Sequence, residues 1–158
     1  KEGLYLACLE KVYSEIRERE HELNLNNLEP KLAILQLVNF TFDHMFNNPN
    51  FVKIVAVENT EGGKFLKKLF KIHGAAISHI DNVREVLIRG SGEKIFRADI
   101  DPFQLYFSIL ALSYLHLSNR HTLSVTYSLD LTDEECLADR KIHVSELILS
   151  YLCDVKAG

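Results

Sequence analysis

The sequence predicts an all-α fold, a helical bundle of about six helices in one domain that spans residues 1–158. Apolar residues recur at helical spacing through most of the chain. Only seven glycines and three prolines interrupt the pattern, which is typical of a helical protein with few turns. Hydrophobic residues make up 47% of the 158, enough for a proper core.

The charge and the cysteines narrow the class of protein. The formal net charge is −4, so these residues do not form the basic surface of a nucleic-acid-binding domain. The three cysteines Cys8, Cys136 and Cys153 make an odd number without CxxC spacing. We expect free thiols and a cytoplasmic protein, with no signal peptide and no membrane span.

The first three helices are separated by polar breaks. A helix is expected from residue 1 to about Leu23, and the charged residues near its end are interpreted as solvated. After a break, Pro30 opens a helix over residues 32–46, which Asn47-Asn48-Pro49 ends. Residues 51–58 are predicted as a short helix, although their β-branched content also allows a strand.

The middle of the chain offers weaker signals. Residues 64–73 predict an amphipathic helix with four lysines outward; binding to a membrane surface is the less favoured alternative. Gly74 is expected to separate this helix from one over residues 75–89, which Gly90-Ser91-Gly92 would stop. Residues 121–130 form a connection of uncertain structure. Thr132 and Glu135 predict a capping box at the start of the last helix.

Residues 101–119 predict the central helix of the domain. Asp101 is a suitable N-cap and Pro102 fits the first turn. Between Asp101 and Arg120 the helix has no Asp, Glu, Lys or Arg and is apolar on nearly every side, so it must be covered on nearly every side. Its clean apolar part is too short to cross a bilayer. We expect one face to pack on its own domain and the other on a second subunit; the central helix of a monomeric bundle is the alternative.

No residues predict catalysis or a metal centre. Glu18 and His21 have the spacing of a di-iron ligand pair, but the second pair and the further glutamates are missing. No nucleophile–base arrangement or paired carboxylates can be identified. We therefore predict a protein that is not an enzyme, with no metal and no cofactor.

Five passages together resemble a known family. They are KEGLYLACLEKVY at the start, LEPKLAILQLVNF, PNFVKIVAVEN, FRADIDPFQLYFSILALSYLHLSNRHTLS and the last amphipathic helix. In this order they resemble the C-terminal regulatory domain of the tetracycline-repressor (TetR) family of bacterial transcription regulators. The resemblance implies a homodimer whose four-helix interface is built from the central and last helices of each chain. It also implies that a helix-turn-helix DNA-binding domain precedes these residues, so operator DNA is a partner of the parent protein only.

The family's mechanism implies two sets of functional residues. A small-molecule effector would bind among the helices, favour one spacing of the DNA-binding domains and release the repressor from its operator. By inward direction and helix order we place the effector among Phe40, His44, Ile54, Glu58, Asn59, Ile77, Tyr106 and Leu110, with Glu58 facing a hydrogen-bonding or cationic group. The dimer interface is placed at Leu105, Ile109, Leu112, His116, Val144, Ile148 and Tyr151. A standalone helical protein-interaction module is the alternative function.

Overall fold

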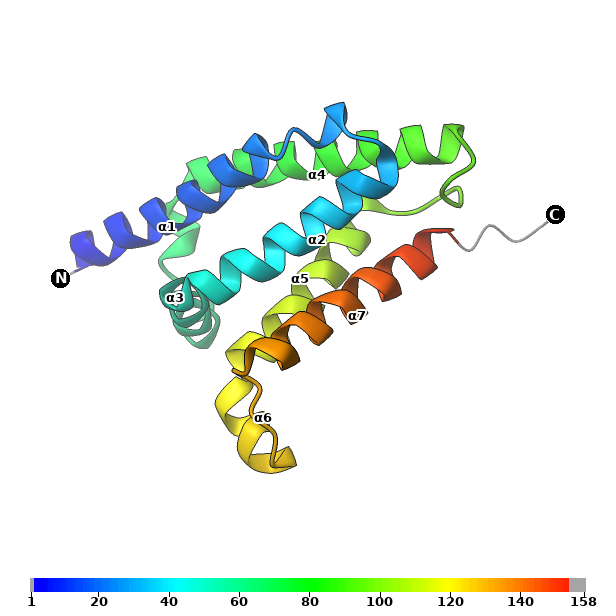
Figure 1. Cartoon of the computed structure of the whole chain (residues 1–158). Helices are drawn as coiled ribbons and strands as arrows, with labels where there is room; N and C mark the ends of the chain where they lie inside the picture. Colours follow the sequence, from blue (N-terminus) through cyan, green and yellow to red (C-terminus); the bar gives the residue numbers. More distant parts are fainter. Residues whose placement is uncertain (1, 154–158) are drawn as a thin grey trace.

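The computed structural model consists of helices throughout the part of the chain that it describes (Figure 1). It describes residues 2–153, with only the backbone for residues 70–76. Those residues form seven α-helices and two short 3-10 helices and no strand, which confirms the all-α prediction. In chain order the elements are α1 (Glu2–Glu22), η1 (Leu25–Asn27), α2 (Pro30–Asn47), α3 (Pro49–Thr60), η2 (Leu66–Lys68), α4 (Phe70–Gly92), α5 (Pro102–Ser118), α6 (Arg120–Tyr127) and α7 (Glu134–Cys153).

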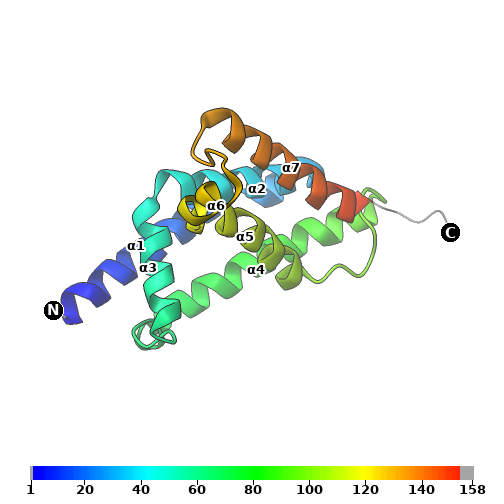
Figure 2. The same ribbon diagram turned by 90° about the horizontal axis from the view of Figure 1, so that it is seen from below.

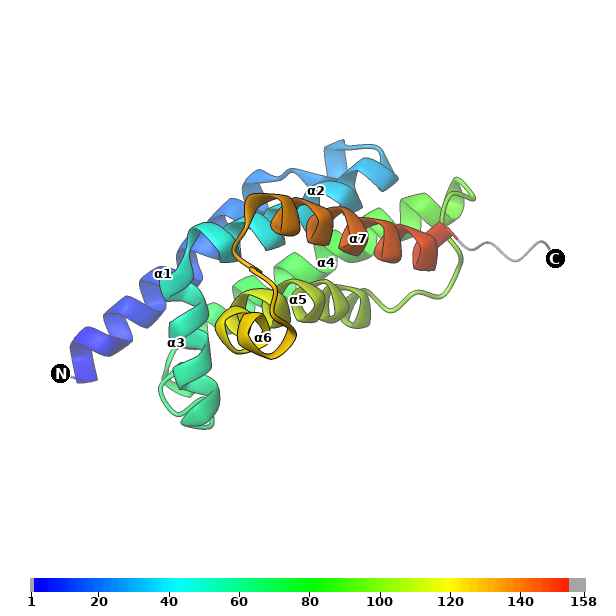
Figure 3. The same cartoon turned by 60° about the horizontal axis from the view of Figure 1, so that its bottom comes forward.

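Helix α2 lies at the centre of the bundle. It packs against α5 and α7 on one side and against α4 on another, while α1 lies along α4 (Figure 1). Helix α3 crosses one end of the bundle, which Figure 3 shows best. Helices α5 and α7 pack against each other, and Figure 2 shows α6 at the far end of α5. Helix α5 packs against α4 and against α2, and α4 in turn packs against α1.

Two hydrophobic cores hold these helices together. The larger core joins α2, α4, α5 and α7, and the smaller core joins α1, α2, α3, α5 and the start of α7. Leu110 on α5 packs against both cores and connects them. Central members of the larger core are Leu37, Val38, Val83, Val86, Ile109, Val144 and Leu152, and those of the smaller core are Ile16, Phe42, Met45, Phe51 and Leu117.

The central helix forms as predicted, but one chain covers only part of it. The carboxylate of Asp101 accepts a hydrogen bond from the amide of Gln104 at 2.7 Å, which confirms the predicted N-cap. Ile109 is completely buried in the larger core. On the opposite side, Phe103 and Phe107 stack at 5.9 Å between ring centroids and remain more than half exposed. A single chain therefore leaves one apolar side of α5 in contact with solvent.

The region between α3 and α5 differs from the prediction. Residues 49–60 form a helix, so the strand alternative for residues 51–58 does not hold. The amphipathic helix over residues 64–73 was wrong: η2 occupies part of that segment, and α4 runs from Phe70 through Gly74 to Gly92. A glycine inside a helix costs about 1 kcal/mol relative to alanine. Packing of the long α4 against α1, α2 and α5 offsets such a cost.

Gly90 has a role other than the predicted helix stop. A Cβ atom on Gly90 would lie 2.1 Å from Cδ2 of Phe96, so only glycine admits this ring against the helix. The carbonyl of Gly90 also accepts hydrogen bonds from the amides of Ile95 and Phe96 at 2.8 and 3.0 Å. The close approach buries Phe96 in the larger core, and α4 ends at Gly92, three residues after the predicted end at residue 89.

The connection before the last helix is itself helical. Residues 120–127 form α6, which ends at Ser128 with a left-handed φ of 53°. The predicted capping box is wrong by one position, because Asp133 accepts from the amides of Glu135 and Cys136 at 3.0 and 3.3 Å. Thr132 instead donates its hydroxyl to Asp130 at 2.6 Å. None of the helices that the structure describes combines the length and the apolar character needed to cross a bilayer.

Candidate functional site

Four polar side chains lie together where α1, α4 and α5 meet, and all but Arg17, which is partly exposed, are buried. Tyr106 on α5 donates its hydroxyl to Oε1 of Glu20 on α1 at 2.6 Å. Arg17 is ion-paired with the other oxygen of Glu20 and donates a hydrogen bond to the Tyr106 hydroxyl at 3.1 Å. Nδ1 of His79 on α4 lies 3.6 Å from Oε2 of Glu20. We call Arg17, Glu20, His79 and Tyr106 the buried polar cluster.

The helical spacing of α1 brings two of these side chains to one face. Arg17 and Glu20 are three residues apart, so they project on the same side of α1 toward α4. The ring of His79 packs edge-on against the ring of Tyr106, with 4.6 Å between centroids. The cluster thus joins three helices by polar contacts, while Glu20 is only 2% exposed.

Burial dominates the electrostatics of the cluster. Burial raises the pKa of Glu20, although the charge of Arg17 and the hydrogen bond from Tyr106 oppose this shift. Burial lowers the pKa of His79 to about 4, and the charge of Arg17 adds to the effect. Burial also raises the pKa of Tyr106. At neutral pH His79 and Tyr106 are therefore neutral, and Arg17 is the cation that faces the Glu20 carboxylate.

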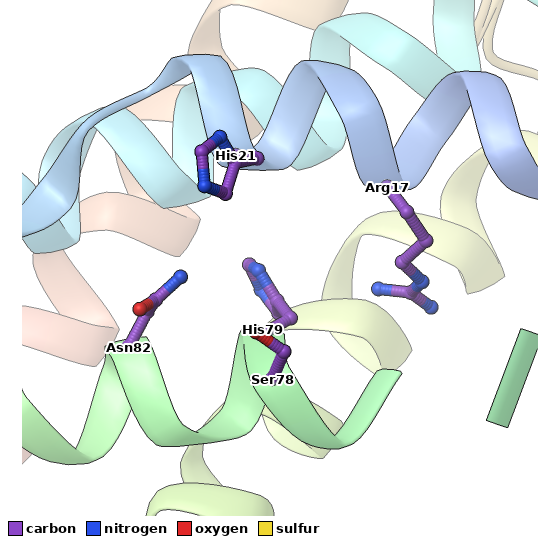
Figure 4. Close-up of a pocket in the computed structure, with 5 residues that line it drawn as sticks. All are labelled: Arg17, His21, Ser78, His79 and Asn82. Atoms are coloured by element: carbon purple, nitrogen blue, oxygen red, sulfur yellow. The ribbon is translucent and has the colours of Figure 1, made fainter. Parts of the chain in front are cut away.

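A small cavity opens beside the cluster, between α1 and α4. Its volume is about 100 Å³, and Figure 4 shows its lining: Arg17 and His21 from α1, and Ser78, His79 and Asn82 from α4. All five side chains are polar, and none is a carboxylate. Because a water molecule occupies about 30 Å³ of liquid, the cavity has room for about three waters or one small polar group.

Two buried nitrogen atoms of the cavity lining have open hydrogen-bonding capacity. Nε2 of His79 and Nε of Arg17 are both buried, and neither has a partner among the residues that the structure describes. The Nδ1 atom of His79 faces the Glu20 carboxylate, which favours the tautomer with its proton on Nδ1. In that tautomer Nε2 is an acceptor. Buried polar atoms of this kind are normally bonded, so a bound molecule is their natural partner.

Other hollows in the described part of the chain are larger. One of about 550 Å³ is lined by Phe40 and by charged residues of α1 such as Glu15 and Arg19. Another of about 320 Å³ is bordered by His44 and Phe51, beside the first turn of α3. Both are surface grooves, and neither is lined by a residue of the buried polar cluster. The cavity between α1 and α4 also reaches the surface, because His21 and Ser78 in its lining are exposed.

The structure distributes the predicted effector residues over several places. Tyr106 lies in the buried polar cluster, while Phe40 and His44 line the two grooves. Glu58 is buried, but its two oxygens already accept from the Tyr5 hydroxyl at 3.0 Å and the Leu66 amide at 2.9 Å. The remaining predicted residues lie apart from the cavity: Ile54 and Leu110 are half-buried, and Asn59 and Ile77 are exposed.

The other residues of the buried polar cluster have no clear signature in the sequence. Arg17 and Glu20 lie in the charged stretch at the end of α1, which predicts a solvated face. His79 lies between polar and apolar residues of α4 without a recognisable motif. The available signal was the position of Arg17 and Glu20 beside the core residue Ile16, on the side of α1 that turns inward. Only the approach of α4 and α5 shows that this side is buried.

The predicted interface residues fall into two groups. Leu105, Ile109, Val144 and Ile148 are at most 2% exposed and belong to the larger core of one chain. His116 is also buried, and its Nε2 lies 3.1 Å from the carbonyl of Leu131; Leu112 is half-buried. Among the predicted set, Tyr151 is exposed, with Arg97 over its ring at 3.9 Å. The large apolar residues that α5 and α7 do expose are Phe103, Phe107, Leu115, Ile142, Leu147 and Tyr151.

Metal-ligand chemistry has no support in the described residues. No group of three or more His, Cys, Asp or Glu side chains lies close enough there to hold a metal ion. Glu18 and His21, which have the spacing of a di-iron pair, are both exposed. The three cysteines are free thiols, as expected.

Two comparisons with known proteins both match this chain to transcription regulators. A family model described as "Tetracyclin repressor-like, C-terminal domain" matches residues 30–148, the stretch from the start of α2 into α7. A relative, the HTH-type transcriptional repressor NicS of Pseudomonas putida, is 33% identical over 149 residues. That similarity covers 94% of this chain and 70% of NicS.

Proposed function

The chain belongs to the tetracycline repressor-like family of transcription regulators, and from this premise we propose that it is the effector-sensing and dimerisation domain of a repressor. The observation that carries the proposal is the family match over residues 30–148, which includes α2 to α6 and most of α7. We propose that a helix-turn-helix domain outside residues 1–158 binds the operator DNA. The whole regulator would act in the cytoplasm. Loss of operator binding when an effector binds would release the regulated genes.

We propose that the effector binds at the cavity between α1 and α4, against the buried polar cluster. In support, the cavity contains buried polar atoms that lack partners among the described residues, a feature expected of a ligand site. The cluster also connects α1 with α4 and α5. Arg17 belongs to α1 and His79 to α4. A ligand that contacts both would therefore stabilise one placement of α1 against α4 over another.

An effector can shift the regulator between two states only through its different affinity for them. Arg17 and Glu20 move with α1, whereas His79 and Tyr106 belong to α4 and α5. A ligand that replaces or strengthens the contacts between these helices would bind the two states with different affinities. This makes α1 the element whose position we expect to respond to the effector.

The exposed apolar residues of α5 and α7 support a homodimer. Leu115 is 58% exposed, and Leu147 and Tyr151 are each more than 40% exposed. The small residues Ser108 and Ala111 are also exposed on α5 and would let a partner helix approach closely. We propose that these residues meet their counterparts in a second chain to form the four-helix interface.

A binding domain is preferred to the other function classes. The family membership is that of a regulator, so we propose that the ligand is bound and not chemically changed. The standalone interaction module is not favoured, because the family model spans most of the helical bundle. A partner helix in an apolar groove therefore does not enter the proposal.

The first test combines molar mass with ligand screening. Light scattering should give the mass of a dimer for the wild type and of a monomer for Leu147→Arg. Ile88→Arg, which changes an exposed aliphatic residue of α4, is the control and should stay dimeric. In a thermal-shift screen of organic acids, amines and neutral compounds, at least one class should raise the melting temperature. A monomeric wild type that no class stabilises would refute the proposal.

A further inference from the structure

We propose that the cavity between α1 and α4 binds the carboxylate group of a small organic acid, and that His79 takes up a proton as the acid binds. This inference rests on the proposed effector site and names the chemical class of its ligand. It depends on the atoms that face the cavity, on the charges behind them and on the cavity's size.

The lining offers donors for an anion. Nε–H of Arg17 is buried and has no partner among the described residues. Ser78 contributes a hydroxyl group, and Asn82 an amide whose oxygen accepts from Asn26 at 3.4 Å, which leaves the NH₂ group to donate. No carboxylate lines the cavity, because Glu20 lies behind it and is engaged by Arg17 and Tyr106. A carboxylate is the group that accepts several such donors at once.

The charge balance requires a proton. Arg17 and Glu20 already compensate each other, so an added carboxylate would leave the buried cluster with an uncompensated negative charge. Protonation of His79 restores neutrality. The ring would then donate from Nδ1 toward Glu20, 3.6 Å away, and from Nε2 into the cavity. Both nitrogens of the ring would have a partner only in the loaded state.

The groups around His79 are consistent with this coupling. Arg17, Glu20 and His21 face it from α1, and Tyr106 faces it from α5. On its own helix, Asp81 is exposed and ion-paired with Arg84. Without ligand, burial and the charge of Arg17 keep His79 neutral, since they lower its pKa to about 4. An anion in the cavity acts in the opposite direction and raises that pKa.

The volume restricts the ligand to a small acid. A cavity of about 100 Å³ is smaller than the roughly 300–1,000 Å³ of sites for drug-sized molecules. Acetate, with four non-hydrogen atoms, is a suitable probe. Acetamide has the same shape and no charge, so it is the matched neutral control.

The experiment measures binding of acetate and acetamide to the folded domain between about pH 5.5 and 7.5, where acetate stays ionised. Binding is followed by NMR chemical shifts during titration. The buffers are cationic amines, because phosphate or carboxylate buffers would compete with acetate for the cavity. Acetate should bind the wild type, with an affinity that falls as the pH rises, by at most about tenfold per pH unit, which is the limit for uptake of one proton. Acetamide should bind far more weakly.

Two variants test the role of His79. His79→Gln keeps a polar side chain that cannot be protonated, so acetate should bind more weakly and without the pH dependence. His143→Gln, the same change at an exposed histidine of α7, should behave like the wild type. Circular dichroism checks that both variants are folded.

Several results would overturn the inference. They are equal affinity for acetamide and acetate, tighter binding of inorganic phosphate than of acetate, a wild-type affinity for acetate that does not change with pH, and no binding of acetate. If an amine or a neutral compound then stabilises the domain in the thermal-shift screen, the effector-sensing function stands and only the carboxylate assignment fails.

Discussion

Helix α5 is buried by two neighbourhoods of opposite chemistry. Toward α2 and α7 it inserts Leu105 and Ile109 into the larger core, whose buried members are nearly all aliphatic. Toward α1 and α4 it presents Tyr106 to Arg17, Glu20 and His79. The two sides are adjacent along one helix, yet only the polar side borders a cavity with open hydrogen-bonding atoms.

This difference separates what stabilises the fold from what can respond to a ligand. An aliphatic core gains free energy from burial alone and does not depend on pH. A buried ion pair contributes little net stability, because desolvation of both charges offsets their attraction. Its charges and hydrogen bonds, however, can be rearranged by a small polar molecule. We therefore assign the maintenance of the bundle to the apolar side and ligand sensing to the polar side.

The largest effect is expected on the apolar side. Ile109→Ala removes a side chain with no exposed surface and should lower the free energy of unfolding by about 4 kcal/mol. Ile88→Ala makes the same change at a side chain that is 57% exposed and should cost less than about 1 kcal/mol. Urea unfolding measures both. Equal losses would show that α5 is not packed as described.

The second prediction concerns the ion pair on the polar side of α5. Glu20→Leu leaves Arg17 without its counter-charge and should cost about 3 kcal/mol, near the lower end for a broken buried pair because Arg17 keeps some exposure. The double variant Arg17→Met with Glu20→Leu removes both charges and should return to within about 1 kcal/mol of the wild type. Urea unfolding again measures both variants. A double variant as unstable as the single one would contradict the idea that unpaired charge causes the loss.

The smallest effect concerns pH. The pKa of His79 is about 4 in the folded chain and 6.5 in an unperturbed histidine, so between these values only the unfolded chain binds the proton. His79 alone should therefore lower the free energy of unfolding by about 2.5 kcal/mol as the pH falls from about 6.5 to 4. The raised pKa of Glu20 acts in the opposite direction and makes the total decrease smaller.

Unfolding curves at several pH values test this expectation. His79→Gln should show a shallower decrease with falling pH than the wild type, because the variant lacks the group that titrates. His143→Gln should retain the wild-type slope, since that histidine is exposed. Identical slopes for the wild type and His79→Gln would place the pH dependence elsewhere in the chain.

Local signals explain how much of the fold could be predicted. Asp101 and Pro102 begin α5 as expected, and Pro30 begins α2, because the cap and the fixed φ act on neighbouring residues only. Pro49 was expected to end the preceding helix and is also the first residue of α3. The errors occurred where a distant contact overrides a local preference. Gly90 would normally end a helix, but it lies inside α4 because the ring of Phe96 packs on it.

Predicting the effector site and the dimer interface required still more knowledge of contacts between distant residues. Leu105, Ile109, Val144 and Ile148 were expected between two chains and lie inside one, because a helix that is apolar all round does not indicate which side its own domain covers. Tyr106 was anticipated as a polar residue on an apolar helix. Its partners were not, since Arg17 and Glu20 have the composition of a solvated face.

The sequence by itself determined the helical class, most helix starts and the family, because these follow from periodicity, from local capping chemistry and from the order of whole segments. Only the tertiary structure decided which faces are buried. Glu20 becomes a buried anion because Tyr106 and His79 reach it from 86 and 59 residues further along the chain. No local pattern encodes such a meeting, since the free energy of a charge depends on its neighbours in space.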